Sequence, residues 1–488
     1  MPSQPIPDWD AVALSRAIAN REVSCVEVMG AFLNRIEAVN PVVNAIVSPR
    51  DPDTLMADAK ARDADLAAGR HRGALHGLPQ AIKDLAPCAG FPTAQGSRLF
   101  ADAVAETDGI MVERMRAAGA IFVGKTNVPE FGLGSQTVNE VFGATLNAYD
   151  QSRTCGGSSG GAAVAVATGM LPVADGSDHG GSLRNPAAWG NIFGLRPSHG
   201  RVPGATDEVF LPAMTVQGPM ARSVPDLAML LSVQAGHDPR CPNSIHEDPA
   251  LFAGDLATDL KGWRVGWLGD LGGKLPFEPG VLDLCERGVD ALRGVGATIE
   301  AVVPDFDPEA VFQAWMTLRS WGLAGAKGAL YADPAKRDHL KEDARWEIER
   351  GLKLSAVEVD RASRVRTAWY EAIRRLFDRF DALVLPGAQV FPFDVGTLWP
   401  REIAGRPMDT YHRWMEVMIP FTMANVPAIS VPVGFSQTGL PTGMQIATPS
   451  HGELKALRIA HAYDVATGWV ARHRPPLLAQ LRTGTDAQ

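Results

Sequence analysis

The sequence predicts an α/β fold with a single mixed, mostly parallel central sheet that is flanked by helices on both faces. Strand-like and helix-like segments alternate through most of the 488 residues, and this alternation favours a sheet covered by helices. Residues 262–304 form a readable strand–helix–strand unit. Between residues 77 and 220, short apolar runs are separated by glycine-rich turns, which is typical of a core that carries a functional site.

The N-terminal part of the chain is predicted to be helical. Apolar residues recur at helical spacing over residues 8–40, which indicates a pair of amphipathic helices. Residues 54–68 resemble another helix. We therefore expect a helical N-terminal region over residues 1–70, packed on an α/β domain that spans residues 71–480.

The second half of the chain continues with readable elements. A strand at RVGWL is followed by a helix over residues 280–295 and a strand at ATIEAVV. Residues 308–380 are charged and helical in pattern. Further strands are expected at residues 381–386, 428–435 and 443–447, and a helix over residues 453–467 closes the fold.

Composition excludes several function classes. With 46% hydrophobic and 21% charged residues, the chain is typical of a globular protein that buries a sizeable core. Its formal net charge is −9 and it has no basic cluster that could neutralise a phosphate backbone, so we expect no nucleic-acid partner. The longest uncharged run, residues 418–435, is interrupted by prolines, so we expect no membrane span.

The cysteines, the histidines and the N-terminus favour a cytoplasmic protein without a metal. The five cysteines lie far apart and form no CxxC pair, so neither a disulfide framework nor a zinc site is expected. The eleven histidines show no HExxH spacing. The start MPSQPIPDWD has no basic residues followed by an apolar run, so it does not resemble a signal peptide.

Residues 119–126, GAIFVGKT, match the phosphate-binding pattern GxxxxGK[ST]. A phosphate-binding loop needs turn-forming residues inside it and a helix after the lysine. Here the inner residues AIFV are strand formers, and Pro129 follows closely. We therefore predict a strand that ends in a turn, rather than a nucleotide site.

The stretch GGSSGG at residues 156–161 contains the pattern GxSxG twice, centred on Ser158 and on Ser159. In α/β-hydrolases this pattern marks a nucleophilic serine on a strand-to-helix turn. The preceding segment NAYDQSRTC does not resemble a buried strand, although histidines downstream leave a Ser–Asp–His triad open. A flexible linker is not expected, because the stretch runs directly into the core-like AAVAVATGMLPVA.

A second glycine–serine stretch and a lysine form a candidate site together with GGSSGG. GSDHGGS at residues 176–182 places Ser182 24 residues after Ser158, and Lys83 lies upstream in GLPQAIKD. Taken alone, such a lysine is typical of a surface residue, and glycines beside serines are typical of turns. Their combination points to a site.

With these stretches the chain resembles the amidase signature family. The resemblance extends over roughly residues 10–470, and the two serine motifs stand at the family's own spacing with the lysine segment upstream. It implies the amidase signature fold, with a variable helical segment around residues 305–420 that borders the substrate pocket. The resembling blocks are GALHGLPQAIKD, AGAIFVGKTNVPEFG, CGGSSGGAAVAVATG, GSDHGGSLRNPAAWGNIFGLRPSHGRVP and PAISVPVGF with GLPTGMQIA.

The resemblance implies a Ser–Ser–Lys triad. Ser182 would be the nucleophile, Ser158 the bridging serine after a cis peptide bond at Gly157, and Lys83 the base. A serine hydroxyl attacks a carbonyl only when a neighbour takes its proton. Lysine can take that proton only when neutral, and burial lowers its pKa from about 10.4. Ser158 would pass the proton from Ser182 to Lys83 and later return it to the leaving amine.

The family pattern also places an oxyanion hole before the nucleophile. The backbone N–H groups of His179, Gly180, Gly181 and Ser182 would stabilise the tetrahedral intermediate. His179 stands where the family more often has threonine or another uncharged residue. Either only its backbone matters, or its imidazole faces the acyl pocket and selects polar substrates.

Other residues are implied to support the site. The backbone near Gly132 would line the acyl pocket, Asp178 and Arg184 would hold the nucleophile loop, and Ser159 would be structural. Aromatic residues of the variable segment would pack in the core or, if several face the site, indicate an apolar or aryl substrate. These aromatic residues are Trp315, Trp321, Phe391, Phe393, Trp399, Tyr411 and Trp414.

Three functions remain as hypotheses. The first is a stand-alone amidase that hydrolyses a C–N amide bond through an acyl-enzyme, with aryl carbamates and esters as further substrates. The alternative is the glutamine-hydrolysing subunit of the tRNA-dependent amidotransferase, which usually reads TDTGGSIRQPA where this chain reads SDHGGSLRNPA. The remote one is a non-catalytic binding protein on the same fold. We expect no cofactor, a small apolar or aryl amide as substrate, and a cytoplasmic monomer or homodimer.

Overall fold

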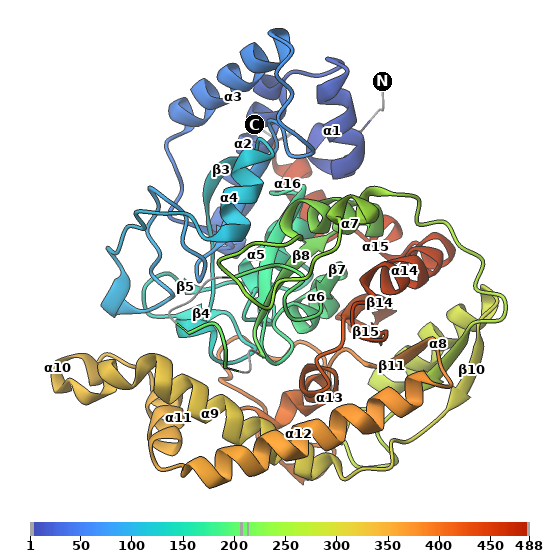
Figure 1. Cartoon of the computed structure of the whole chain (residues 1–488). Coiled ribbons are helices and arrows are strands. Elements are labelled where there is room, and N and C mark those ends of the chain that lie inside the picture. Colours follow the sequence, from blue (N-terminus) through green and yellow to red (C-terminus); the bar gives the residue numbers. More distant parts are fainter. Residues whose placement is uncertain (1–3, 205–207, 212–213, 486–488) are drawn as a thin grey trace.

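A large mixed sheet runs through the centre of the computed structural model, which describes residues 4–204, 208–211 and 214–485 (Figure 1). Helices cover both of its faces, so the predicted α/β class is confirmed. Its strands are β6 (Val173–Asp178), β7 (Phe193–Arg196), β8 (Val216–Ala221), β9 (Arg264–Trp267), β10 (Thr298–Ala301), β11 (Ala382–Pro386), β14 (Ala428–Phe435) and β15 (Pro441–Ala447). Their order across the sheet is β10-β9-β11-β15-β14-β7-β8-β6.

The sheet is mixed, as predicted, but it is not mostly parallel. The pairs β10–β9 and β9–β11 are parallel, whereas the other five neighbouring pairs are antiparallel. The parallel pair β9–β10 is the strand–helix–strand unit of the sequence, joined by α8 (Val281–Gly294). β14 and β15 are joined by residues 436–440 alone, which is too short for a parallel crossover. The length of the connection between two strands therefore decides whether they pair in parallel or antiparallel. The alternation of strands and helices along the sequence does not decide it.

The expectation of a single sheet also needs correction. β1 (Ile46–Val47), β3 (Ile121–Thr126) and β2 (Pro79–Lys83) form a separate three-stranded sheet in the order β1-β3-β2. β2 lies beside the edge strand β6, where the backbone N–H of Lys83 donates to the Asp175 carboxylate at 3.1 Å. The Asp175 side chain thus accepts the hydrogen bond that a backbone carbonyl would accept if β2 and β6 were paired in one sheet. β3 is the strand predicted within residues 119–126, which match the phosphate-binding pattern.

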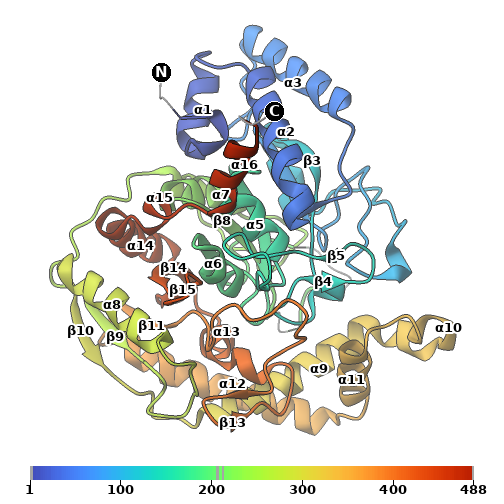
Figure 2. The ribbon, with the colours of Figure 1, turned by 180° about the vertical axis from the view of Figure 1, so that it is seen from behind.

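The N-terminal helices pack on the same hydrophobic core as the sheet. The second of them begins with a capping box, in which the side chains of Ser24 and Glu27 each accept the other's backbone N–H. Figures 1 and 2 show these helices at one end of the molecule, with the last helix beside them. They are α1 (Ala11–Ala19), α2 (Cys25–Val43) and α3 (Pro52–Ala67), and the last helix is α16 (Leu477–Thr485).

The helices nearest the centre are short and fully buried. α5 (Gly160–Ala167) is built from small residues and begins within GGSSGG, which confirms that this stretch is not a linker. α6 (Arg184–Gly190) is equally buried and follows the second serine. The other helices that pack on the central sheet are α8, α7 (Val224–Gln234), α14 (Glu453–Thr467) and α15 (Trp469–Arg472), and α4 (Ile110–Ala117) packs against α7.

A group of helices lies at the end of the molecule opposite α1–α3 (Figure 2). It falls within the variable segment that the resemblance implies, residues 305–420. Its members are α9 (Pro308–Ala332), α10 (Pro334–Arg337), α11 (Glu342–Leu352), α12 (Ala356–Phe377) and α13 (Ile419–Met423), which begins at the end of that segment and runs past it. α9 packs against α11, α12 and α13, so this group reaches back to the core.

Short elements complete the described fold. None of the helices within the described ranges combines the length and the apolar composition needed to cross a membrane. The short elements are the strand pairs β4 (Val138–Asn139) with β5 (Gly143–Ala144) and β12 (Glu402–Ile403) with β13 (Arg406–Pro407), and the 3-10 turns η1 (Ile6–Asp8), η2 (Arg98–Phe100), η3 (Glu130–Gly132), η4 (Pro249–Ala253) and η5 (Arg413–Met418).

Candidate active site

The structure brings the lysine and both serine stretches to one place. Lys83 ends β2, Ser158 precedes α5, and Ser182 lies in the loop between β6 and α6. The backbone N–H of Ser159 donates to the carbonyl of Ser182 at 3.3 Å, which ties the two serine loops together. The side chains of Lys83, Ser158 and Ser182 are all at least nine-tenths buried.

The amine of Lys83 lies directly against Ser158. Its Nζ is 2.9 Å from Ser158 Oγ, 2.7 Å from Ser159 Oγ and 3.2 Å from the carbonyl of Ser177. Burial lowers the pKa of Lys83 to about 7, against the opposing pull of the Asp175 and Asp178 carboxylates. A neutral amine has a lone pair besides its N–H groups, so Lys83 can accept a serine proton near neutral pH.

Ser159 plays a larger part than the sequence predicts. The family pattern implies a structural role, yet its Oγ is the shortest contact of Lys83 Nζ and also donates to the carbonyl of Ser177 at 3.2 Å. Ser159 and Ser177 therefore help to hold the lysine amine in place. The repeated pattern GxSxG is the only signal for Ser159 in the sequence, and it does not tell which serine meets the base.

Gly132 lies against Ser158, as its expected place in the acyl pocket requires. It has a φ of +71°, and a Cβ placed on it would lie 3.3 Å from Ser158 Oγ and 2.8 Å from Leu85 Cδ1. The peptide bond between Gly157 and Ser158 is cis, which confirms the expectation from the family pattern.

We expect Gly132→Ala to lower kcat/KM for an amide substrate by at least about 10-fold, because the new methyl group presses on Ser158 and misplaces its hydroxyl. Gly134→Ala is the matched control. Gly134 also has a positive φ, +92°, but its Cβ would meet nothing nearer than Tyr411 at 4.0 Å. Both variants should lose about 1 kcal/mol of unfolding free energy through backbone strain. Steady-state kinetics and urea unfolding of both variants test this, and equal kinetic losses would contradict it.

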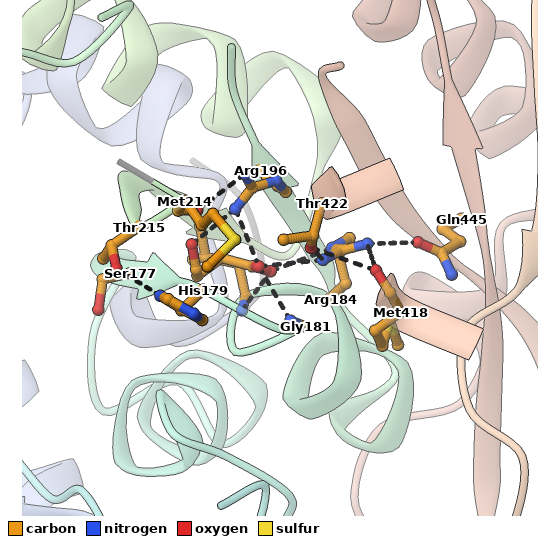
Figure 3. A network of polar contacts seen from close by, with 12 residues as sticks. Ser177, His179, Gly181, Arg184, Arg196, Met214, Thr215, Met418, Thr422 and Gln445 are labelled. Atoms are coloured by element: carbon orange, nitrogen blue, oxygen red, sulfur yellow. Dashed lines mark hydrogen bonds and ion pairs between the residues drawn. The ribbon is translucent and has the colours of Figure 1, made fainter. Parts of the chain in front are cut away.

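Asp178 organises the nucleophile loop. Its buried carboxylate accepts the backbone N–H groups of Gly181 at 2.9 Å and Leu183 at 3.1 Å. Arg184 donates to both carboxylate oxygens at 3.0 Å, and Arg196 donates to one of them at 3.2 Å (Figure 3). Burial alone would raise the pKa of Asp178, but the two guanidinium groups outweigh it and hold that pKa well below its usual range. Asp178 and Arg184 thus hold the loop, as expected.

Gly181 departs from the prediction. Its N–H is expected in the oxyanion hole, but Asp178 already accepts it. By contrast, the N–H groups of His179, Gly180 and Ser182 make no hydrogen bond within the described part of the chain. The donors available for an oxyanion are therefore these three, and Gly181 braces the loop.

Arg184 and Arg196 connect this loop to distant elements (Figure 3). Arg184 donates to the carbonyl of Met418 at 3.0 Å and to Gln445 Oε1 at 2.6 Å, which joins the loop to α13 and β15. Arg196 donates to the carbonyl of Met214 at 2.9 Å. No pattern in the sequence singles out Arg196 or Gln445, because a buried polar residue and an exposed one look alike in a single sequence.

We expect Asp178→Asn to lower the unfolding free energy by about 3–5 kcal/mol, because it leaves two buried arginines without their anion. Activity should fall as well, since the loop that carries Ser182 loses its brace. Asp226→Asn is the control: Asp226 is also buried, but it accepts the backbone N–H of Val12 and should cost only about 1–2 kcal/mol. Urea unfolding of the two variants measures the difference, and equal losses would refute the role given to the arginines.

The side chain of His179 faces α9. Its Nδ1 is 2.9 Å from Thr215 Oγ1 (Figure 3). Its ring lies 6.1 Å from the ring of Trp315. Burial and the nearby Arg319 guanidinium lower the pKa of His179 well below its usual value, so the imidazole is neutral. Trp315 is fully buried, and a Cβ on Gly180 would lie 2.9 Å from its indole. Trp315 is therefore the aromatic residue that borders the nucleophile loop.

Other aromatic residues of the variable segment pack in the core. The rings of Trp414 and Trp189 stack at 5.7 Å, and Phe393 meets both edge-on. These three rings belong to one continuous hydrophobic core. The expectation that the aromatic residues of the variable segment pack in the core thus holds for Trp414 and Phe393.

Comparison with known proteins identifies the family. The family model described as Amidase matches residues 27–457. A glutamyl-tRNA(Gln) amidotransferase subunit of Chloroflexus aurantiacus is 34% identical, with 96% of this chain and 98% of the relative covered. The acylamidase of Rhodococcus erythropolis is 33% identical, with 94% of this chain and 95% of the relative covered.

Solved structures agree with this result. A bacterial aryl acylamidase of the amidase signature family superposes with a TM-score of 0.91 at 28% identity, covering 98% of this chain and 99% of that one. The native peptide amidase of Stenotrophomonas maltophilia superposes with a TM-score of 0.79 at 27% identity, covering 97% and 99%. Sequence and structure together show that this chain belongs to the amidase signature family.

Proposed function

We propose that the protein is a stand-alone amidase that hydrolyses a C–N amide bond through an acyl-enzyme on Ser182. The observation that carries the proposal is the contact between Lys83 Nζ and Ser158 Oγ at 2.9 Å in a fully buried setting. Burial that lowers the pKa of Lys83 to about 7 supplies the base that serine chemistry needs.

In the proposed reaction, Ser182 Oγ attacks the amide carbon while its proton moves to Ser158, which passes its own proton to Lys83. The tetrahedral intermediate collapses when the C–N bond breaks, and the relay runs in reverse to protonate the leaving amine. Water then attacks the ester on Ser182 with the same base, which releases the acid and restores the serine. Each step moves one proton along the same path.

The oxyanion of each tetrahedral intermediate would be stabilised by backbone N–H groups. We assign this role to His179, Gly180 and Ser182, whose N–H groups have no partner among the described residues. The brace formed by Asp178 and Arg184 holds these donors in place before the substrate binds, and such preorganisation is what makes an oxyanion hole effective.

A second candidate function is the glutamine-hydrolysing subunit of the tRNA-dependent amidotransferase. The 34% identity to the amidotransferase subunit of Chloroflexus aurantiacus favours it. The loop sequence SDHGGSLRNPA argues against it, because the resembling subunit usually reads TDTGGSIRQPA there. The acylamidase of Rhodococcus erythropolis, at 33% identity, favours the stand-alone enzyme.

A small substrate panel separates these functions. We would measure hydrolysis of 4-nitroacetanilide, an aliphatic amide, glutamine and an aryl carbamate by the native protein and by Ser182→Ala. Activity on the anilide or the carbamate, absent from the variant, is the expected result. Activity on glutamine alone would favour the amidotransferase function, and activity on none of them with no labelling of Ser182 by a fluorophosphonate would favour a binding protein.

A further inference from the structure

A buried polar set lies beside Trp315. Arg319 on α9, Glu347 on α11, and Tyr411 and His412 just before η5 are all buried. Arg319 Nε donates to Glu347 Oε1 at 2.9 Å, and His412 Nε2 is 2.5 Å from the same oxygen. The hydroxyl of Tyr411 also donates to Oε1, so one carboxylate oxygen receives all three contacts.

Three atoms of this neighbourhood are left without a partner. Glu347 Oε2, His412 Nδ1 and Trp315 Nε1 are buried and make no hydrogen bond within the described ranges of the chain. The three side chains are 0% exposed. The rings of Trp315 and His412 meet edge-on at 5.1 Å, and the Arg319 guanidinium lies 5.3 Å from the Trp315 ring. Buried polar atoms without partners are rare and costly, so these three atoms are suited to bind a polar group.

The charges define what this ligand must offer. Burial would raise the pKa of Glu347, but Arg319 and His412 outweigh it, so the carboxylate is charged. Burial lowers the pKa of His412 to about 4, although Glu347 opposes it, so the imidazole is neutral. Arg319 Nε lies 3.1 Å from His412 Nε2, but Nε2 is closer to the Glu347 carboxylate, at 2.5 Å, so we assign the one imidazole proton to Nε2 and the Arg319 N–H to Glu347. The unpartnered atoms are therefore two acceptors, Glu347 Oε2 and His412 Nδ1, and one donor, Trp315 Nε1–H.

The set adjoins the proposed catalytic site. The indole of Trp315 lies against Gly180, two residues before Ser182. His179 lies beside the same indole at 6.1 Å between ring centres, and its Nε2 is also without a partner among the described residues. The Trp315 indole thus lies next to both the loop that carries Ser182 and the polar set.

We propose that Trp315, Glu347 and His412 bind a primary carboxamide that the substrate carries in addition to the amide bond that is cleaved. A carboxamide has two N–H donors for Glu347 and His412, and an oxygen with two lone pairs that can accept from Trp315 and from His179. This proposal rests on the proposed function, because it names the substrate class of the same site.

Other ligand classes fit this set less well. The charges of Arg319 and Glu347 cancel within the pair, so an ammonium or carboxylate group would be buried without a counter-charge, which is costly. An alkyl or aryl group would leave all three atoms unpartnered. The prediction of an apolar or aryl substrate is thus refined. The part of the substrate next to Trp315 can be apolar, but the group at its end is neutral and both donates and accepts hydrogen bonds.

Two series of substrates test the proposal on the full-length protein. In the first, the acyl half of a 4-nitroanilide ends in a carboxamide, an isopropyl group of similar shape, a carboxylate or an ammonium. In the second, acetanilide carries the same four groups on its aryl half. We expect the carboxamide to give at least about 10-fold higher kcat/KM than the isopropyl compound in one series, which also identifies the half that reaches the set. Equal or lower values in both series overturn the proposal.

Trp315→Phe removes the N–H donor and keeps an aromatic ring. It should lower kcat/KM for the carboxamide compound by about 10-fold and leave the isopropyl compound within about 3-fold. Trp346→Phe is the control, because Trp346 also contacts His412, at 6.2 Å between ring centres, but is 38% exposed. If Trp315→Phe lowered kcat/KM equally for both compounds, Trp315 would contribute through packing and not through a hydrogen bond to the carboxamide. Unchanged turnover in Ser182→Ala would instead contradict the proposed function itself, so the two failures are distinguishable.

Discussion

Replacing Ser182 with alanine is expected to lower kcat for every amide substrate by at least about 10⁴-fold, because no other group can form the acyl-enzyme. Ser182 lies in the loop that Asp178 braces, and its carbonyl accepts the N–H of Ser159. The variant should therefore keep its loop structure and its thermal stability. Stopped-assay kinetics with 4-nitroacetanilide measure the loss, and mass spectrometry after treatment with a fluorophosphonate locates the labelled serine.

Ser177→Ala is the matched control for this variant. Ser177 lies five residues upstream on β6 and contacts Lys83 through its backbone carbonyl, which the substitution preserves. Its activity should stay within about 3-fold of the native protein, since the side chain has no assigned role. Labelling of a serine other than Ser182, or retained turnover in Ser182→Ala, would refute the assignment of the nucleophile.

Replacing Lys83 with methionine is expected to produce a loss that depends on pH. As a base, Lys83 must be neutral, and burial lowers its pKa to about 7. For the native protein, kcat/KM should rise about tenfold per pH unit below pH 7 and level off above it. Lys83→Met should lose about 10²–10⁴-fold at pH 7 and less at pH 10, where hydroxide can replace the base. A profile of kcat/KM from pH 5 to pH 10 for both proteins measures this.

Lys125→Met is the control for removing a buried lysine. Lys125 lies on the neighbouring strand β3, and its Nζ donates to the carbonyl of Ala86 at 2.7 Å, away from the serines. The variant should lose stability but keep the shape of the pH profile. If Lys83→Met lost the same factor at every pH, or if Lys125→Met moved the midpoint near pH 7, the proton relay through Lys83 would be contradicted.

The sequence is sufficient for the elements and for the main site residues. Helical spacing locates α1 to α3, and the alternation of short apolar runs locates β9, β11, β14 and β15. The strand over Ile121–Thr126 is predicted because its residues are strand formers, although residues 119–126 also match the phosphate-binding pattern. Lys83 and Ser158 are named from their motifs, and the structure places them in contact.

Details that depend on contacts between distant segments are not predictable in this way. The direction of β14 and β15 follows from a five-residue connection, and the separate sheet of β2 follows from the Asp175 side chain. Ser159 and Ser158 are neighbours in the same motif, and only the position of Lys83 shows that both of them contact it. Such errors arise because periodicity reports which face of an element is apolar, and not which element it meets.

The fold class, the family and the residues of the proposed triad follow from the sequence alone, because they depend on local motifs and on their spacing along the chain. Which N–H groups remain for an oxyanion depends on the folded chain, since Asp178 takes that of Gly181. Folding also lowers the pKa of Lys83, through burial, and brings Trp315, Glu347 and His412 together from three separate segments. Hydrogen-bond partners and burial are properties of the packed chain, and they are what turn named residues into a site.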